Sequence, residues 1–157
     1  MYRNKDKTKI NVPIPAYITP RDKGEIALRI IDFIRERTRE GFNVYGRRWS
    51  PVNPKQAGAY TKEYAEIKGY SSPVDLEDTG DMLDAITFFV NRKKGEVTIG
   101  YKQGTKQERK AEGNILGSYG SAPNPRKSRP FLDILKKDVD KICQDYIKEV
   151  EEEGADG

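Results

Sequence analysis

The feature that most constrains this sequence is an apolar stripe near its C-terminal end, which recurs at helical spacing for about five turns. Its members are Phe131, Leu135, Val139, Ile142, Tyr146 and Val150. Charged residues fill most of the positions between them, and Pro130 suits a helix start. The pattern predicts a long amphipathic helix over about 130–152. Cys143 lies on or beside the stripe, so we expect a buried, unreactive thiol.

A second amphipathic helix is predicted over about 20–40. Thr19 can cap it, Pro20 suits its first position, and Asp22 completes a pattern like a capping box. Gly41 is the expected stop. Five apolar residues at helical spacing form one face: Ile26, Ala27, Ile30, Ile31 and Ile34.

A β-hairpin is predicted between the two helices, with strands over about 86–91 and 97–101. Gly95 supplies the positive φ that the turn needs, and a helical turn precedes the first strand. A lone hairpin is barely stable in water. It therefore needs both helices on one face and further strands from the N-terminal arm or from a neighbouring subunit. The predicted fold class is α+β, a small antiparallel sheet centred on the hairpin.

Residues 1–18 are predicted to form an extended N-terminal arm, because prolines alternate with apolar residues over 11–18. Such an arm is either disordered in the free chain or docked on a neighbouring subunit. The expected organisation is this arm, a single α+β domain over 19–152, and an acidic tail over 153–157.

The amino-acid composition narrows the range of functions that the chain can have. The 157 residues include 29 Lys and Arg, 25 Asp and Glu, one Cys and no His, for a formal net charge of +4. The absence of histidine removes the commonest general base and zinc ligand, which makes an enzyme less expected, although Lys, Asp, Glu and Tyr can still do chemistry. We expect no metal and no cofactor. No apolar run is long enough to span a bilayer, and the polar N-terminus does not resemble a signal peptide. We therefore expect no membrane partner and folding in the cytoplasm.

Basic residues gather in two places. The segment 102–129 has 28 residues, little expected structure beyond a possible short helix near 106–112, and a local net charge of +5. The Arg47-Arg48-Trp49 cluster precedes a proline-rich stretch and a predicted short helix over 61–68. An Arg-Arg-Trp cluster can stack on a nucleic-acid base, although a tryptophan that plugs a small core is the more common arrangement.

An acidic stretch before the hairpin contains Asp75, Glu77, Asp78, Asp81 and Asp84. It lacks the alternating spacing and closing glutamate of a calcium loop. A solvated turn and helix N-terminus is the favoured interpretation, and a metal-dependent enzyme is the weakest alternative.

Five motifs in order carry a family resemblance. The first two are Gly46 to Trp49 after the first helix, and an acidic Leu76–Ile86 stretch with Thr79-Gly80 at its centre. Then come a hairpin that ends in Ile99-Gly100, a loop from Ala111 to Gly117, and Arg129-Pro130-Phe131-Leu132 before the last helix. Together they resemble the tail-completion or virion-morphogenesis proteins of tailed bacteriophages, which include head–tail joining and tail-terminator subunits.

The resemblance implies a structural protein of the virion neck, assembled in the host cytoplasm, with no catalytic residues. It implies a homo-oligomeric ring, by analogy a hexamer, that completes the tail and contacts the head connector and the tail-tube or sheath proteins. Basic loops that face the lumen would touch passing DNA only through phosphates. The alternative is a nucleic-acid-binding module that uses loop 102–129 and the Arg47-Arg48-Trp49 cluster. The candidate interface residues are Val12, Ile14, Tyr17, Arg47, Arg48, Lys106, Arg109, Lys110, Arg126, Lys127 and Arg129.

Overall fold

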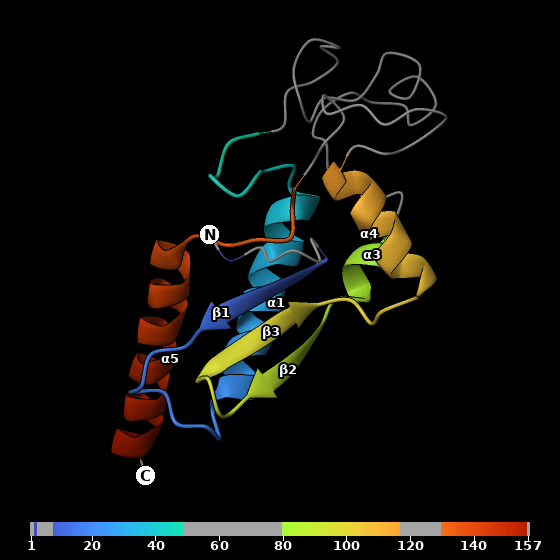
Figure 1. Ribbon diagram of the computed structural model, residues 1–157. Helices are drawn as coiled ribbons and strands as arrows, with labels where there is room; N and C mark the ends of the chain where they lie inside the picture. The colour runs from blue at the N-terminus through green and yellow to red at the C-terminus, as the bar shows by residue number, and fades with distance from the viewer. Residues whose placement is uncertain (1, 3–7, 49–79, 117–129, 157) are drawn as a thin grey trace.

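A computed structural model describes residues 2, 8–48, 80–116 and 130–156 (Figure 1). The described elements are β1 (Lys9–Pro13), α1 (Lys23–Arg39), α3 (Gly80–Asp84), β2 (Thr87–Asn91), β3 (Glu96–Gly100), α4 (Lys106–Leu116) and α5 (Lys136–Asp156). They form a small antiparallel sheet with helices packed on it, which confirms the predicted α+β class. The predicted helix at 61–68 lies outside the described residues.

The sheet has three strands in the order β1-β3-β2. The central and outer strands β3 and β2 form the predicted hairpin, and Gly95 in its turn has φ 63°. The third strand comes from the chain's own arm, because β1 pairs antiparallel with β3, with Ile10 opposite Ile99. The arm prediction is therefore corrected at 9–13, where the residues belong to the folded domain. Their apolar side chains alternate with polar ones, so one face of this strand joins the core.

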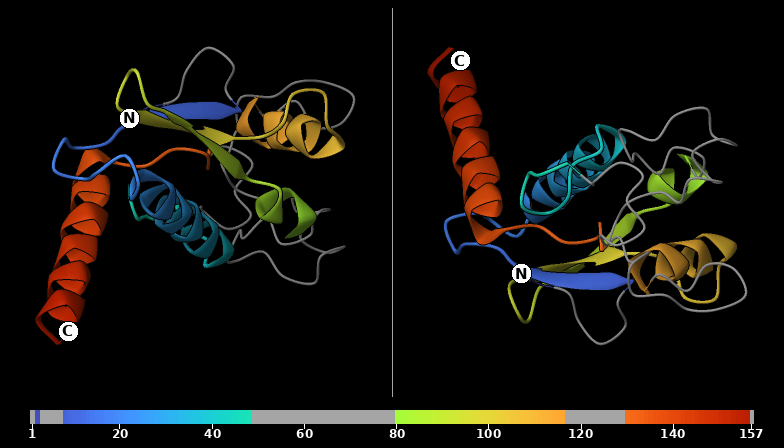
Figure 2. Two further views of the ribbon diagram at one scale, coloured as in Figure 1. Left: turned by 90° about the horizontal axis from the view of Figure 1, so that it is seen from below. Right: turned by 90° about the horizontal axis from the view of Figure 1, so that it is seen from above.

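Helix α1 covers one face of the sheet, and α5 packs along α1 (Figure 2). All five residues of the predicted α1 stripe are buried. The helix begins at Lys23, later than the predicted Pro20, because Thr19 and Asp22 close a turn of their own. In that turn the Asp22 N–H donates to the Thr19 carbonyl at 2.9 Å, and the Thr19 hydroxyl donates to the Asp22 carboxylate at 2.8 Å.

The last helix begins at Lys136, six residues later than predicted. Residues 131–134 are all buried, which a helical turn on the surface does not allow. Arg37 also occupies two carbonyls that a helix would use for its own ladder, those of Phe131 and Asp133, at 2.5 and 3.0 Å. At the other end α5 continues to Asp156, so most of the predicted acidic tail is helical.

The predicted long loop contains α4, which extends the expected short helix to Leu116. Its buried side chains are Ala111, Asn114 and Ile115. The Asn114 amide donates to the Lys110 carbonyl at 3.0 Å and lies 3.4 Å from the Met82 sulfur. These contacts attach α4 to α3, beyond one end of the sheet (Figure 1).

Candidate functional site

The two edge strands of the sheet differ in how well they are protected. On the β1 edge, Pro13 has no N–H to offer, and the outward N–H of Asn11 donates to the Tyr2 carbonyl at 3.3 Å. The β1 edge is therefore largely closed to a further strand.

The direction of the main-chain groups of β3 follows from its contacts with β1. The Tyr101 N–H donates to the Thr8 carbonyl at 3.2 Å, just beyond the paired strands. Because N–H and C=O groups point to opposite sides at alternate residues, Ile99 and Val97 also face β1. Thr98, which lies between them, faces β2.

The opposite edge of β2 is open by the same alternation. Phe89 lies opposite Thr98, so its main-chain groups point inward to β3. Phe88 and Val90 then direct their N–H and C=O groups away from the sheet. The sequence of this strand, Thr-Phe-Phe-Val-Asn, has no charge and no proline, which are the usual devices that keep an edge strand from pairing.

Apolar side chains flank the open edge on both faces. Phe89 is 68% exposed on the face that α1 does not cover. On the α1 side, Leu28 is 46% exposed. Leu28 lies one helical turn after Gly24, and Gly24 is next to β2, because a Cβ built on it would lie 3.6 Å from the Phe88 ring. The β2 edge therefore combines unpaired main-chain groups with exposed apolar side chains, which suits a strand from another chain.

Two arm residues predicted at an interface lie elsewhere. Val12 and Ile14 are buried in the core of their own chain, so the prediction that they contact a partner is wrong for the folded arm. Their burial follows from the pairing of β1 with β3, which turns Val12 toward α1. Tyr17, in the connection to α1, is 55% exposed and stays available.

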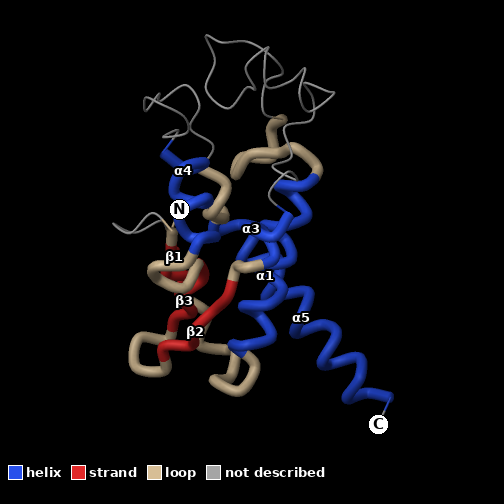
Figure 3. Tube along the Cα trace, turned by 90° about the vertical axis from the view of Figure 1, so that its right-hand side faces the viewer, coloured by secondary structure: helices blue, strands red, loops and turns tan. Residues whose placement is uncertain are grey.

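The described basic candidates lie on the surface at one end of the molecule, on the segment after α1 and on α4 (Figures 1 and 3). Lys106 and Arg109 are exposed, and Lys110 is partly buried. Arg47 is exposed, and the exposed Arg48 lies 4.7 Å from the centre of the Phe42 ring and donates to the Glu40 carbonyl at 3.3 Å. Trp49, Arg126, Lys127 and Arg129 lie outside the described residues.

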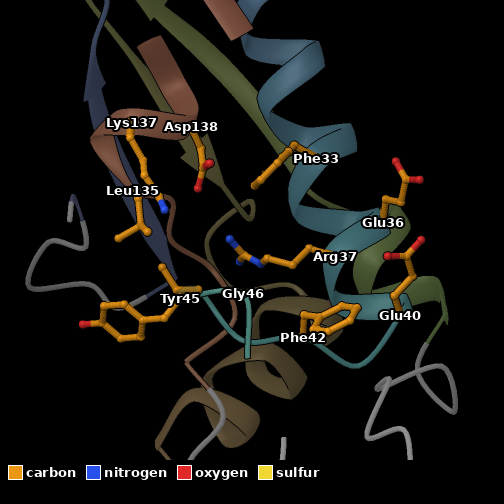
Figure 4. A pocket seen from close by; sticks show the side chains of 11 residues that line it. Phe33, Glu36, Arg37, Glu40, Phe42, Tyr45, Gly46, Leu135, Lys137 and Asp138 are labelled. Carbon is orange, nitrogen blue, oxygen red and sulfur yellow. The ribbon is translucent and has the colours of Figure 1, made fainter. Parts of the chain in front are cut away.

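A pocket of about 310 Å³ lies between the end of α1, the segment after it and the start of α5 (Figure 4). Arg37 reaches into it from α1, and Lys137 and Asp138 reach into it from α5. Burial lowers the pKa of the Arg37 guanidinium to about 10. Sequence reasoning missed this residue, although a signal was present: Arg37 continues the α1 apolar stripe, seven residues after Ile30.

The acidic stretch gives no metal site in the part that can be described. Within 80–116 and the other described ranges, no three Asp, Glu, Cys or His residues gather as metal ligands would. Asp84 instead pairs with Arg39 at 2.7 Å. Asp75, Glu77 and Asp78 lie outside the described residues.

Comparisons with protein-family models, with curated proteins and with solved structures find no match for this chain. Among the described helices, none is long and apolar enough to cross a membrane.

Proposed function

We propose that this chain is a structural subunit of the neck of a tailed bacteriophage, which forms a ring in which the β2 edge of each copy takes up an extended segment of its neighbour. The observation that carries the proposal is the open edge itself, with the main-chain groups of Phe88 and Val90 turned outward and Phe89 exposed beside them. In a monomer an uncharged open edge promotes aggregation, whereas in an assembly it serves as an interface between subunits.

The residues that carry the family resemblance support the proposal through their structural roles. Phe131 and Leu132 are fully buried, and at Gly100 the main chain of β1 leaves no room for a Cβ. A chain in which these residues build the scaffold, and in which the β2 edge is open, suits an assembly subunit. Its proposed partners are further copies of itself, the head connector and the tail-tube or sheath proteins.

The exposed basic residues support a secondary role within the ring. Arg47, Lys106 and Arg109 are exposed at one end of the molecule, where phosphate contacts with passing DNA are possible without base recognition. Binding of this kind weakens steeply as salt rises. Unchanged DNA affinity between low and high salt would remove this role and leave the assembly role in place.

The experiment is the mass of the purified chain in solution, measured by sedimentation over a range of concentrations. The proposal expects a defined closed oligomer. A monomer at high concentration, together with absence of the chain from purified particles, would refute it.

Two substitutions test where the subunits join. Val90→Pro removes an outward N–H and leaves the β2–β3 ladder intact, so it should abolish assembly while the monomer stays folded. Phe89→Lys should weaken assembly, because it places a charge on the exposed edge. Gln144→Lys, on the exposed surface of α5, adds the same charge as a control. If Tyr17→Lys dissociates the oligomer and Phe89→Lys does not, strand addition at β2 is wrong.

A further inference from the structure

The Arg37 pocket contains a buried cation that lacks a carboxylate partner among the described residues. Arg37 is 8% exposed, and its Nη2 donates to two main-chain carbonyls, those of Phe131 and Asp133. Its Nε and Nη1 are buried, and no described residue offers them a hydrogen-bond acceptor. Together these two atoms carry three N–H bonds. A buried guanidinium with unsatisfied donors is costly unless an anion pairs with it.

The surroundings of this cation favour an anion in the pocket. The guanidinium points toward the space between α1 and α5, and the Lys137 ammonium points into the same space (Figure 4). Glu36 and Glu40 line the rim but point away from the guanidinium. Asp138 faces the guanidinium, and the charges of Asp138 and Asp133 partly offset the lowering of its pKa by burial, but neither carboxylate forms an ion pair with it among the described residues. The N-terminal end of α5 adds the positive end of a helix dipole.

We propose that this pocket binds a carboxylate from the acidic end of α5 in a neighbouring copy of the chain. The end of α5 carries three consecutive exposed glutamates, Glu151, Glu152 and Glu153. Glu149, just before them, is already paired with Arg29 at 2.6 Å. The inference rests on the proposed ring and names one contact within it.

The same molecule cannot place its own glutamates in its own pocket. The pocket residue Lys137 lies near the start of α5, and Glu151 is 14 residues further on, about 21 Å along the helix. Beyond Glu149, which still pairs with Arg29 of α1, the end of α5 projects away from the sheet, and Val150 of the apolar stripe is 42% exposed (Figures 2 and 3). A contact from the end of one helix to the start of the next is head-to-tail, the type of interface that closes rings.

A peptide-binding measurement tests the pocket separately from ring formation. A labelled, amidated peptide of residues 148–157 is titrated with the full-length protein and followed by fluorescence anisotropy. The peptide with Gln at 151–153 should bind at least about tenfold more weakly. Lys137→Glu should cause a similar loss, and Lys141→Glu, one turn further along α5 and outside the pocket, should not. Equal binding of both peptides, or equal loss in both variants, overturns the proposal.

Arg37→Met should abolish peptide binding. Because Arg37 also holds two carbonyls, this variant counts only if its circular dichroism is native, and otherwise Lys137→Glu decides the question.

Mixing two full-length variants tests the head-to-tail geometry. Lys137→Glu blocks the pocket, and the triple change Glu151→Gln, Glu152→Gln, Glu153→Gln removes the charges of the acidic end. Each variant alone should fail to assemble, and the mixture should form heterodimers through the one intact pair. A mixture that stays monomeric would refute the head-to-tail contact. A peptide that binds to a chain that never forms rings would support the pocket and contradict the proposed ring.

Discussion

Substitution of Gly100 by alanine is expected to destabilise the sheet strongly. Gly100 pairs with Lys9 across the β1–β3 ladder. A Cβ at this position would lie 2.2 Å from the Thr8 carbonyl oxygen and 2.8 Å from the Lys9 Cα. Close carbon–oxygen contacts in sheets are about 3.3 Å, so β1 must move by about 1 Å. Because the obstructing atoms are main chain, no side-chain rotation can relieve the clash.

The size of the effect follows from that displacement. Overpacking of a close-packed site costs about 1–3 kcal/mol. A shift of β1 also stretches the Tyr101–Thr8 hydrogen bond, now 3.2 Å, and a lost hydrogen bond costs about 1 kcal/mol. We expect Gly100→Ala to lower the free energy of unfolding by about 3 kcal/mol. For a chain of this size, that corresponds to a fall in Tm of about 6–12 °C.

Urea unfolding, followed by circular dichroism, measures this change against a matched control. Gly24→Ala makes the same chemical substitution in α1, where the new Cβ would make ordinary contact with Phe88 at 3.6 Å. It should change stability by less than about 1 kcal/mol, in the stabilising direction. If Gly100→Ala proves as mild as Gly24→Ala, the close approach of β1 and β3 is wrong.

Three further predictions concern single side chains. Arg35 donates to three main-chain carbonyls at the end of α3 and before β2, at 2.8, 2.8 and 3.3 Å, so Arg35→Met should cost about 2 kcal/mol in urea unfolding. Arg39 pairs with Asp84 on the surface, so Arg39→Met should cost less than about 1 kcal/mol; equal costs would refute the distinction. The Tyr146 hydroxyl donates to Asp22 at 2.8 Å and lowers the pKa of that carboxyl. The stabilisation of the fold by this bond is therefore present above the unfolded-state pKa of Asp22, and it is lost as pH falls through the folded-state pKa. Tyr146→Phe should raise the Asp22 pKa in an NMR titration, and its stability deficit should shrink in acid; an unchanged pKa would exclude the bond. Burial raises the pKa of the Cys143 thiol to about 11, so its reaction with a disulfide reagent at pH 8 should be at least about a hundredfold slower in the folded chain than in urea, and equal rates would place the thiol on the surface.

Local periodicity was sufficient to predict the main helices and the hairpin. The stripe from Ile26 to Ile34 and the turn at Gly95 depend on neighbours in sequence, and both are present in the fold. Helix boundaries were less well predicted, because the start of α5 depends on Arg37, which lies almost a hundred residues away and occupies the carbonyls that precede this helix. The candidate site residues also differ in how far local sequence predicted them. Exposed basic residues such as Arg109 could be identified from charge alone. The burial of Val12 and Ile14 could not, because it depends on the pairing of β1 with β3.

The sequence by itself determined the α+β class, the two amphipathic helices and the hairpin, because side-chain period and turn chemistry are properties of short segments. Only the tertiary structure decided that the arm supplies the third strand, that β2 is the open edge, and that Arg37 is buried without a carboxylate partner among the described residues. Each of these depends on which distant segments pair. Strand order and burial are set by the free energy of the whole packed core, which no local window of the chain contains.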